Sequence, residues 1–162
     1  LGNAVYQAGL GRSPAPFRLI PGVHELLHAC ASIYPLAVVS ARGERSTRRF
    51  LPQFNLQGSF RCVATAHTVK HTKPYPDPIL WAASELGVQP QECLMIGDTT
   101  VDIHAARRSG AQSVGVLCGF GEERELRRAG ADLIIHRTPD LWQHLPGGTQ
   151  STNQGDRQGA RY

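Results

Sequence analysis

Five short apolar runs, each ended by turn residues, limit most strongly what this chain can fold into. They are too short for helices and show no strict alternation of apolar and polar residues, which is typical of strands buried on both faces of a parallel sheet. The runs are residues 36–39, 60–64, 93–96, 113–117 and 132–135.

Helical patterns separate these runs. Pro78 suits a first helical turn with Asp77 as its cap, and Gly87, Gly110 and Gly130 suit helix ends. Regular alternation of strand and helix predicts a doubly wound, mostly parallel, Rossmann-like α/β sheet. The expected helices are residues 23–33, 43–54, 78–86, 99–109 and 122–129.

The composition fits one globular domain and narrows the choice of partners. The chain has 162 residues, 41% of them hydrophobic, and a formal charge of +4. Its arginine clusters lie within helical patterns without an aromatic platform, so we interpret them as solvated helix faces and expect no nucleic-acid partner. No apolar run is long enough to cross a bilayer, so we expect no membrane partner. The arginines are at positions 42, 45, 48, 49, 107, 108, 124, 127 and 128.

The two ends and the cysteines complete the general expectations. The chain starts with Leu1 rather than Met, which suggests a fragment or a processed chain. Its start shows no secretory signal pattern. The four cysteines have neither metal-binding nor redox spacing, so a reducing cytoplasm is the expected location. Residues 146–162 contain few apolar side chains after Pro146, and we expect a disordered polar tail there.

Two aspartates follow one of the expected strands. Asp98 comes directly after the run that ends at Gly97, and Asp102 lies one helical turn further on. Open α/β sheets place their sites at the carboxyl ends of strands, and Mg²⁺ prefers one or two carboxylates together with water and phosphate oxygens. The segment therefore predicts a magnesium site, although a helix cap followed by a surface acid would give the same pattern.

Two further segments suit phosphate binding. Lys73 precedes Pro-x-Pro-Asp-Pro, so its ammonium stands on a stiffened loop, where it can hold a phosphoryl oxygen. Ser40 ends a buried run, and its hydroxyl with the backbone N–H of Ala41 can cradle a phosphate. The alternatives are a solvated loop lysine and an ordinary helix cap.

Together, the strand that ends in Ser40, the Lys73 segment and the Gly97-Asp98-Thr99 segment resemble the second, third and fourth motifs of haloacid dehalogenase-type phosphatases. The order and spacing agree, and the glycine-rich segment 115–121 is similar to phosphoglycolate phosphatase-like members. The resemblance covers about residues 19–145 and implies a core domain there. It also implies that residues 1–18 are the remnant of a helical cap and its linker.

The resemblance implies a role for each matching residue. Ser40 and Lys73 would be catalytic and, with Ala41, would bind the phosphoryl group. Asp98 would ligate Mg²⁺ and Asp102 would support it. The family acts on small phosphorylated metabolites through an aspartyl-phosphate, but no Asp-x-Asp precedes Ser40 in this sequence. We therefore expect a phosphatase whose nucleophile is not among these residues, with the chain as given inactive.

The resemblance also implies that a central strand is absent. In the family it lies between the strand that ends at Ser40 and the strand that ends at Gly97. A row of buried, unpaired peptide groups is costly, so an open gap is not expected. The two strands could pair directly, a partner could supply the strand, or the chain could be unstable, and we favour instability.

Two other functions are weighed against this one. His24-Glu25-Leu26-Leu27-His28 has the spacing of a zinc-protease helix, but the apolar residues around it form an ordinary amphipathic face. A non-catalytic fragment, pseudoenzyme or binding module that keeps the same sheet is the more serious alternative. The substrate and the oligomeric state are not predicted from the sequence.

Overall fold

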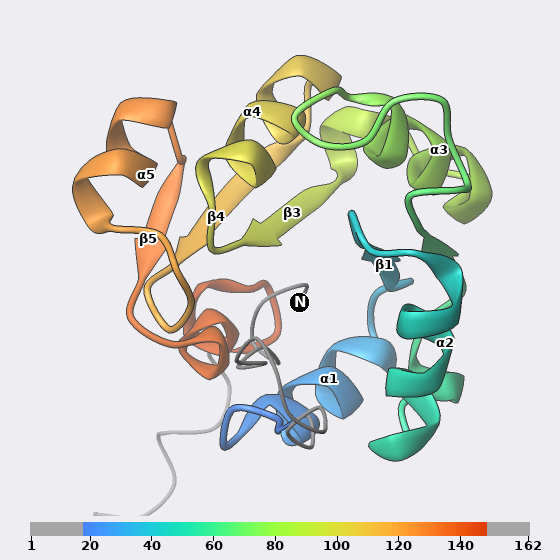
Figure 1. Ribbon diagram of the computed structural model, residues 1–162. Helices are drawn as coiled ribbons and strands as arrows, with labels where there is room; N and C mark the ends of the chain where they lie inside the picture. The colour runs from blue at the N-terminus through green and yellow to red at the C-terminus, as the bar shows by residue number, and fades with distance from the viewer. Residues whose placement is uncertain (1–17, 149–162) are drawn as a thin grey trace, which may run out of the picture.

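The computed structural model describes residues 18–148, which form an α/β fold in which every strand pairing is parallel (Figure 1). This confirms the fold class expected from the alternating pattern. The strands are β1 (Ala37–Val39), β2 (Cys62–Ala64), β3 (Leu94–Gly97), β4 (Gln112–Val116) and β5 (Leu133–Ile135). The helices are α1 (Val23–Ala31), α2 (Glu44–Gln53), α3 (Asp77–Leu86), α4 (Thr100–Ser109) and α5 (Glu123–Ala129). Short 3₁₀ turns are η1 (Gln57–Ser59), η2 (Pro90–Glu92) and η3 (Thr138–His144).

The strands form two separate sheets. One has the order β1-β2 and the other the order β3-β4-β5. The gap lies between β1 and β3, where the resemblance implies an absent strand. Direct pairing of these two strands, one of the outcomes expected for the gap, does not occur within residues 18–148. Instead a cavity of about 720 Å³ separates them, which we call the inter-sheet cavity.

Helix α1 joins the two sheets from one side. Leu26 and Cys30 belong to the core cluster that contains residues of β4 and β5, whereas Val23 and Leu27 belong to the cluster beside β1. One amphipathic helix therefore buries two neighbouring stripes against two sheets. Burial of a large aliphatic side chain contributes on the order of 1.5–3 kcal/mol, so these contacts hold the sheets together without strand pairing.

Helices α3 and α4 join the sheets from another side. Helix α3 contacts β1 and β2 of the first sheet and α4 of the second. Ile79 of α3 is buried with Ala105 and Ala106 of α4, and Cys93 and Met95 pack against the same cluster. The alanines let the two helices approach closely.

The helix ends agree with those predicted from the sequence, with one exception. Gly87, Gly110 and Gly130 each adopt the left-handed conformation that ends a helix, as expected. The prediction that Asp77 caps α3 is wrong. Asp77 is the first residue of that helix, and its carboxylate contacts His71 Nδ1 at 3.0 Å instead. This hydrogen bond lowers the pKa of Asp77 below its ordinary value.

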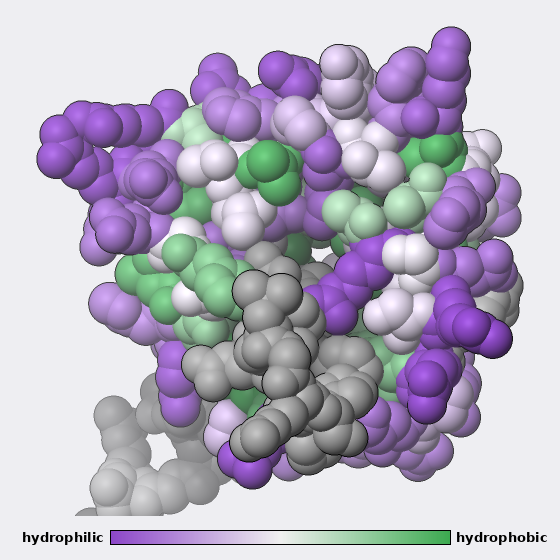
Figure 2. All heavy atoms as spheres, viewed as in Figure 1, coloured by the Kyte–Doolittle hydropathy of each residue, from purple (hydrophilic) through white to green (hydrophobic). Residues whose placement is uncertain are grey.

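Figure 2 shows hydrophilic residues over α5, where Arg124, Arg127 and Arg128 are exposed. No helix of the described part is long and apolar enough to cross a membrane. Pro146 accepts a hydrogen bond of 2.6 Å from the Tyr34 hydroxyl. The expected cap remnant up to residue 17 and the expected tail from residue 149 lie outside the described residues.

Candidate active site

The polar residues selected from the sequence lie after strands at the carboxyl edge of the two sheets. Ser40 directly follows β1, and Asp98 directly follows β3. Asp102 stands in the first turn of α4, the helix that leaves this edge. Because all pairings are parallel, the ends of β1 and β3 point in the same direction.

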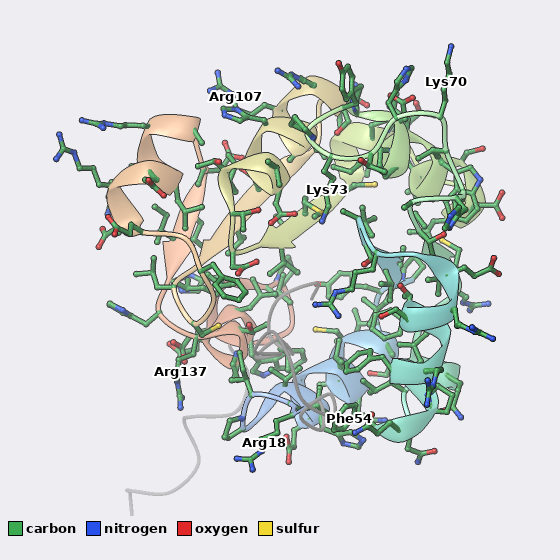
Figure 3. All side chains as sticks on the ribbon, in the orientation of Figure 1. Arg18, Phe54, Lys70, Lys73, Arg107 and Arg137 are labelled. Carbon is green, nitrogen blue, oxygen red and sulfur yellow. The ribbon has the colours of Figure 1, made fainter. Side chains whose placement is uncertain are left out.

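Lys73 bridges the two sheets at this edge. Its ammonium Nζ donates to the carbonyl oxygen of Val39, the last residue of β1, at 3.2 Å. It also donates to Asp102 Oδ1 at 2.6 Å. The Lys73 side chain is 7% exposed and that of Asp102 5%, so the ion pair is buried. Figure 3 shows Lys73 between β3 and the end of β1.

The loop that carries Lys73 is anchored from α4. Arg108 Nη1 donates to the carbonyl oxygen of Pro74 at 2.7 Å, and the Lys73–Pro74 peptide bond is cis. Two residues of α4, Asp102 and Arg108, thus hold the Lys73 segment through its side chain and its backbone. The lysine therefore has a fixed position, and the alternative of a solvated loop lysine is wrong for its ammonium.

Asp102 uses both carboxylate oxygens within the protein. Oδ1 accepts from Lys73, and Oδ2 accepts from the Thr99 backbone N at 3.1 Å and from Thr99 Oγ1 at 2.7 Å. Burial disfavours the charged carboxylate, but the Lys73 ammonium and the hydrogen bonds from Lys73 and Thr99 outweigh it. The pKa of Asp102 consequently lies below its ordinary value.

Asp98 is held by the glycine-rich loop after β4. Its Oδ2 accepts a hydrogen bond from the Phe120 backbone N at 2.8 Å. A side chain on Gly119 would collide with the Asp98 carboxylate, and one on Gly121 with the Asp98 carbonyl oxygen. The loop can therefore close over this aspartate only because both positions lack a Cβ. Asp98 is 4% exposed, and the described residues give its Oδ1 no hydrogen-bond donor.

Ser40 faces the loop before α2. Its backbone N donates to the Ala64 carbonyl oxygen at 2.9 Å, and its Oγ accepts from the Arg42 backbone N at 3.1 Å. The residue at the N-cap of α2 is Gly43, so Ser40 is not the helix cap that the alternative interpretation required. Ala41 is exposed in the intervening bend.

These carboxylates fit a magnesium ion only in part. Within residues 18–148, no group of three or more His, Cys, Asp or Glu side chains could hold a metal. Mg²⁺ requires fewer protein ligands, because it keeps several waters and often takes phosphate oxygens. Asp98 offers one such ligand. Asp102 is committed to Lys73 and Thr99, so it would reach a metal only by giving up one of these partners or through water.

The histidines of the zinc-protease pattern lie on α1. The His24 and His28 rings stand edge to face, with centroids 4.7 Å apart, and His28 is exposed. Glu25 between them is also exposed. Among residues 18–148, no third His, Cys, Asp or Glu side chain completes a metal-binding group with them.

Three residues of the site were not found from the sequence. Thr99, Phe120 and Arg108 act through a hydroxyl, a backbone N–H and a guanidinium, respectively. Thr99 could have been recognised from Thr-x-x-Asp, the spacing of a capping box. The two glycines on either side of Phe120 were the available signal for the glycine-rich loop after β4.

Comparison with known proteins finds a matching family and related sequences. The family model described as haloacid dehalogenase-like hydrolase matches residues 11–116. The phosphoglycolate phosphatase of Escherichia coli strain K12 is 32% identical over 137 residues, which are 84% of this chain and 54% of that protein.

Two solved structures have the same fold. The structure described as a predicted phosphoglycolate phosphatase from Haemophilus somnus 129pt superposes with a TM-score of 0.74 at 28% identity, over 79% of this chain and 57% of that one. A hydrolase from Pseudomonas syringae gives a TM-score of 0.71 at 34% identity, over 77% of this chain and 59% of that one. The chain spans about half the length of the curated relatives it matches.

Proposed function

Since this chain belongs to the haloacid dehalogenase-like hydrolases, we propose that it supplies the phosphate-binding and metal-binding side of a Mg²⁺-dependent phosphatase. The substrate class is a small phosphoric monoester, and 2-phosphoglycolate is the first candidate because curated relatives of this chain are phosphoglycolate phosphatases. The observation that carries the proposal is the buried Lys73 ammonium at the common carboxyl edge of both sheets.

The residues selected at the carboxyl edge of the two sheets each have a role in this proposal. Lys73 holds a phosphoryl oxygen and offsets its negative charge, which is worth more in a site shielded from water. The Ser40 hydroxyl and the N–H of Ala41 donate to the other phosphoryl oxygens. Asp98 holds Mg²⁺, which when bound would neutralise charge on the phosphoryl group.

Asp102 has a positioning role in this proposal as well as a role beside the metal. Its Oδ1 holds the Lys73 ammonium and its Oδ2 holds the start of α4. The geometry therefore favours Asp102 as the residue that fixes Lys73, with support to the metal through water. The resemblance implied that Asp102 supports the metal, and the role in fixing Lys73 is added to that here.

The nucleophile is proposed to come from elsewhere. Residues 1–39 contain no aspartate, and the aspartyl-phosphate route needs a carboxylate beside the phosphoryl group. We propose that a form of the protein with the additional length found in the relatives is active, and that residues 1–162 alone are not. A non-catalytic binding module is the alternative.

Steady-state hydrolysis tests the proposal. The protein translated from the complete reading frame and the 162-residue chain are compared on 2-phosphoglycolate and p-nitrophenyl phosphate, with Mg²⁺ or EDTA. We expect turnover by the first protein only, abolished by EDTA. Lys73→Met should lower kcat/KM on the order of 100-fold.

Lys70→Met is the matched control, because Lys70 is exposed in the same loop, and it should leave kcat/KM unchanged. Strong turnover by the 162-residue chain, abolished by EDTA, would contradict the proposed origin of the nucleophile. Absence of turnover by both proteins would favour the binding module.

A further inference from the structure

We propose that His24 and His28 of α1 form a binding site for one divalent late transition metal ion, which Cu²⁺ and Ni²⁺ fit best. The ion clips together one turn of the helix that joins the two sheets. The site shares no residue with the candidate active site, and it offers imidazole nitrogen, whereas Mg²⁺ takes oxygen ligands. The proposal therefore does not depend on the proposed phosphatase function.

The two histidines are neighbours on the surface of α1. Residues four apart in a helix lie one above the other, and the two ring centroids are 4.7 Å apart. His28 is exposed and His24 is partly exposed. Within residues 18–148, neither ring has a hydrogen-bond or ion-pair partner. Each ring can therefore turn about its Cβ–Cγ bond and direct a nitrogen at a shared ion.

The separation of the rings suits an angle near 90° at the metal. A metal–nitrogen bond of about 2.0–2.1 Å, as for zinc, puts the ion about 3.2 Å from each ring centre. Ring centres are then about 4.5 Å apart at an angle of about 90°, and about 5.2 Å apart at the tetrahedral angle of about 109°. The 4.7 Å between the two centroids is closer to the first value. Square-planar or tetragonal coordination by nitrogen and oxygen is typical of Cu²⁺ and Ni²⁺.

The surroundings of the pair favour a cation. Glu25 lies three residues before His28, so the two side chains are neighbours on the helix surface, and Glu25 is exposed. Its negative charge favours a positive ion beside His28. Because no third His, Cys, Asp or Glu of residues 18–148 completes the group, water fills the remaining positions. The ion has two protein ligands, fewer than the four of a closed structural zinc site.

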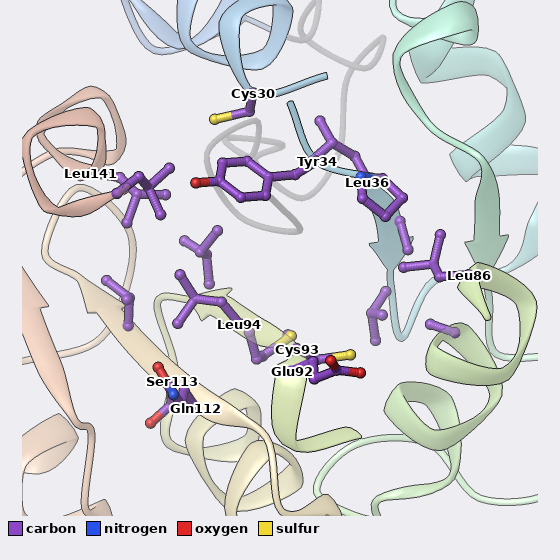
Figure 4. A pocket seen from close by; sticks show the side chains of 18 of the residues that line it. Cys30, Tyr34, Leu36, Leu86, Glu92, Cys93, Leu94, Gln112, Ser113 and Leu141 are labelled. Atoms are coloured by element: carbon purple, nitrogen blue, oxygen red, sulfur yellow. The ribbon is translucent and has the colours of Figure 1, made fainter. Parts of the chain in front are cut away.

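The opposite face of α1 gives the site a consequence for the fold. The apolar residues of this helix belong to the core clusters beside both sheets. Figure 4 shows one of them, Cys30, at the inter-sheet cavity. The helix has only nine residues, and Gly22 at its N-cap provides no side-chain hydrogen bond. A short helix without such a cap depends on other contacts, so a metal across its exposed face stabilises the connection between the sheets.

Metal titration tests the site. Cu²⁺ and Ni²⁺ are each titrated into the protein from the complete reading frame, with Mg²⁺ in excess, and binding is followed by calorimetry. His24→Gln and His28→Gln should each lower the affinity of one metal site by at least about tenfold, since loss of an outer-shell partner alone costs that much. Glutamine is a good helix former, so both variants should keep α1. His67→Gln is the matched control and should leave the affinity unchanged, because His67 and His71 are also four residues apart but lie outside any helix.

Hydrogen exchange tests the consequence for α1. It is measured by mass spectrometry on a proteolytic fragment that covers this helix. At a Ni²⁺ concentration about ten times the Kd, exchange of the α1 amides should slow by about tenfold, because the metal binds only the formed helix. His28→Gln should show no such protection at the same Ni²⁺ concentration.

Four outcomes would overturn the proposal. Unchanged affinity in both α1 variants would remove the site. Loss of affinity in only one of them would show a single surface histidine instead of a clip. An equal loss on His67→Gln would place the ion in the loop before Lys73. Binding that leaves the exchange of α1 unchanged would show an ion that adheres to the surface without stabilising the helix.

Discussion

The positive charge of Lys73 is balanced inside the protein by the Asp102 carboxylate. This ion pair fixes the position of the Lys73 ammonium, the most important cation of the site. Both side chains are almost fully buried. Removing one partner of a buried ion pair leaves the other charge without compensation, at a cost of about 3–5 kcal/mol. That is a large share of the roughly 5–15 kcal/mol by which domains are stable.

A double-mutant cycle measures this balance. Lys73→Met and Asp102→Asn should each lower the free energy of unfolding by about 3 kcal/mol, and the double variant should lose less than the sum of the two. Urea denaturation at neutral pH gives all four values. Asp140→Asn is the control, because its 3.5 Å pair with Arg137 is exposed and should be worth less than about 1 kcal/mol. Additive losses for Lys73 and Asp102 would show that the pair is not coupled.

The same pair predicts a pH dependence. The pKa of Asp102 is lowered in the folded state, so its contribution to stability is fully present above the unfolded pKa of about 3.9. It is lost as the pH falls through the lower folded pKa. The difference in urea midpoint between the wild type and Asp102→Asn should therefore shrink below about pH 4. A constant difference down to pH 2 would contradict this origin.

Gly119 is one of the two residues that let the glycine-rich loop after β4 approach Asp98. Gly119→Ala should displace the Asp98 carboxylate or the loop, because a Cβ would overlap the carboxylate. In the active form we expect Mg²⁺ affinity to fall by about 10–100-fold, the usual effect of disturbing the support of a metal ligand. Gly58→Ala is the control, since nothing lies within 4 Å of a Cβ there. Unchanged Mg²⁺ activation of the Gly119 variant would remove Asp98 from the metal site.

At the scale of elements, the sequence predicted what is local and missed what depends on tertiary contacts. The apolar runs predicted the strands, and the glycines predicted the helix ends. Both have local causes, because buried strands and left-handed helix ends depend on residues close together in the sequence. The sequence pattern predicted Asp77 as a helix cap, but its carboxylate instead contacts His71 Nδ1, a tertiary contact that local spacing does not reveal. The Lys73–Asp102 pair joins residues 29 positions apart, which no local spacing reveals.

The packing of helix α5 against its neighbours on the second sheet can be tested with one substitution. Leu126 is fully buried, in a cluster with Ile103 and Ala129. Leu126→Ala should lower the free energy of unfolding by about 2–5 kcal/mol, as expected for a core cavity. Leu80→Ala on α3 is the control, because Leu80 is 42% exposed and should cost much less. Equal losses in urea denaturation would show that α5 is not packed as described.

At the scale of the whole molecule, two sheets share one carboxyl edge although they do not pair. From strand pairing alone, an open gap between β1 and β3 is not expected. The structure shows three other connections: α1 between the two core clusters, α3 against β1 and α4, and Lys73 between Val39 and Asp102. That the 162-residue chain is unstable by itself stays a prediction, and thermal unfolding would test it.

The central claim is that Asp98 at this edge serves a Mg²⁺-dependent phosphatase, and one substitution tests it most directly. Asp98→Asn keeps the size of the side chain and an acceptor for the Phe120 N–H but removes the charge that would bind the metal. In the protein from the complete reading frame, kcat/KM for 2-phosphoglycolate at saturating Mg²⁺ should fall by at least about 100-fold. Asp140→Asn should not change it. A value for Asp98→Asn within about twofold of the wild type, with folding intact, would contradict the account.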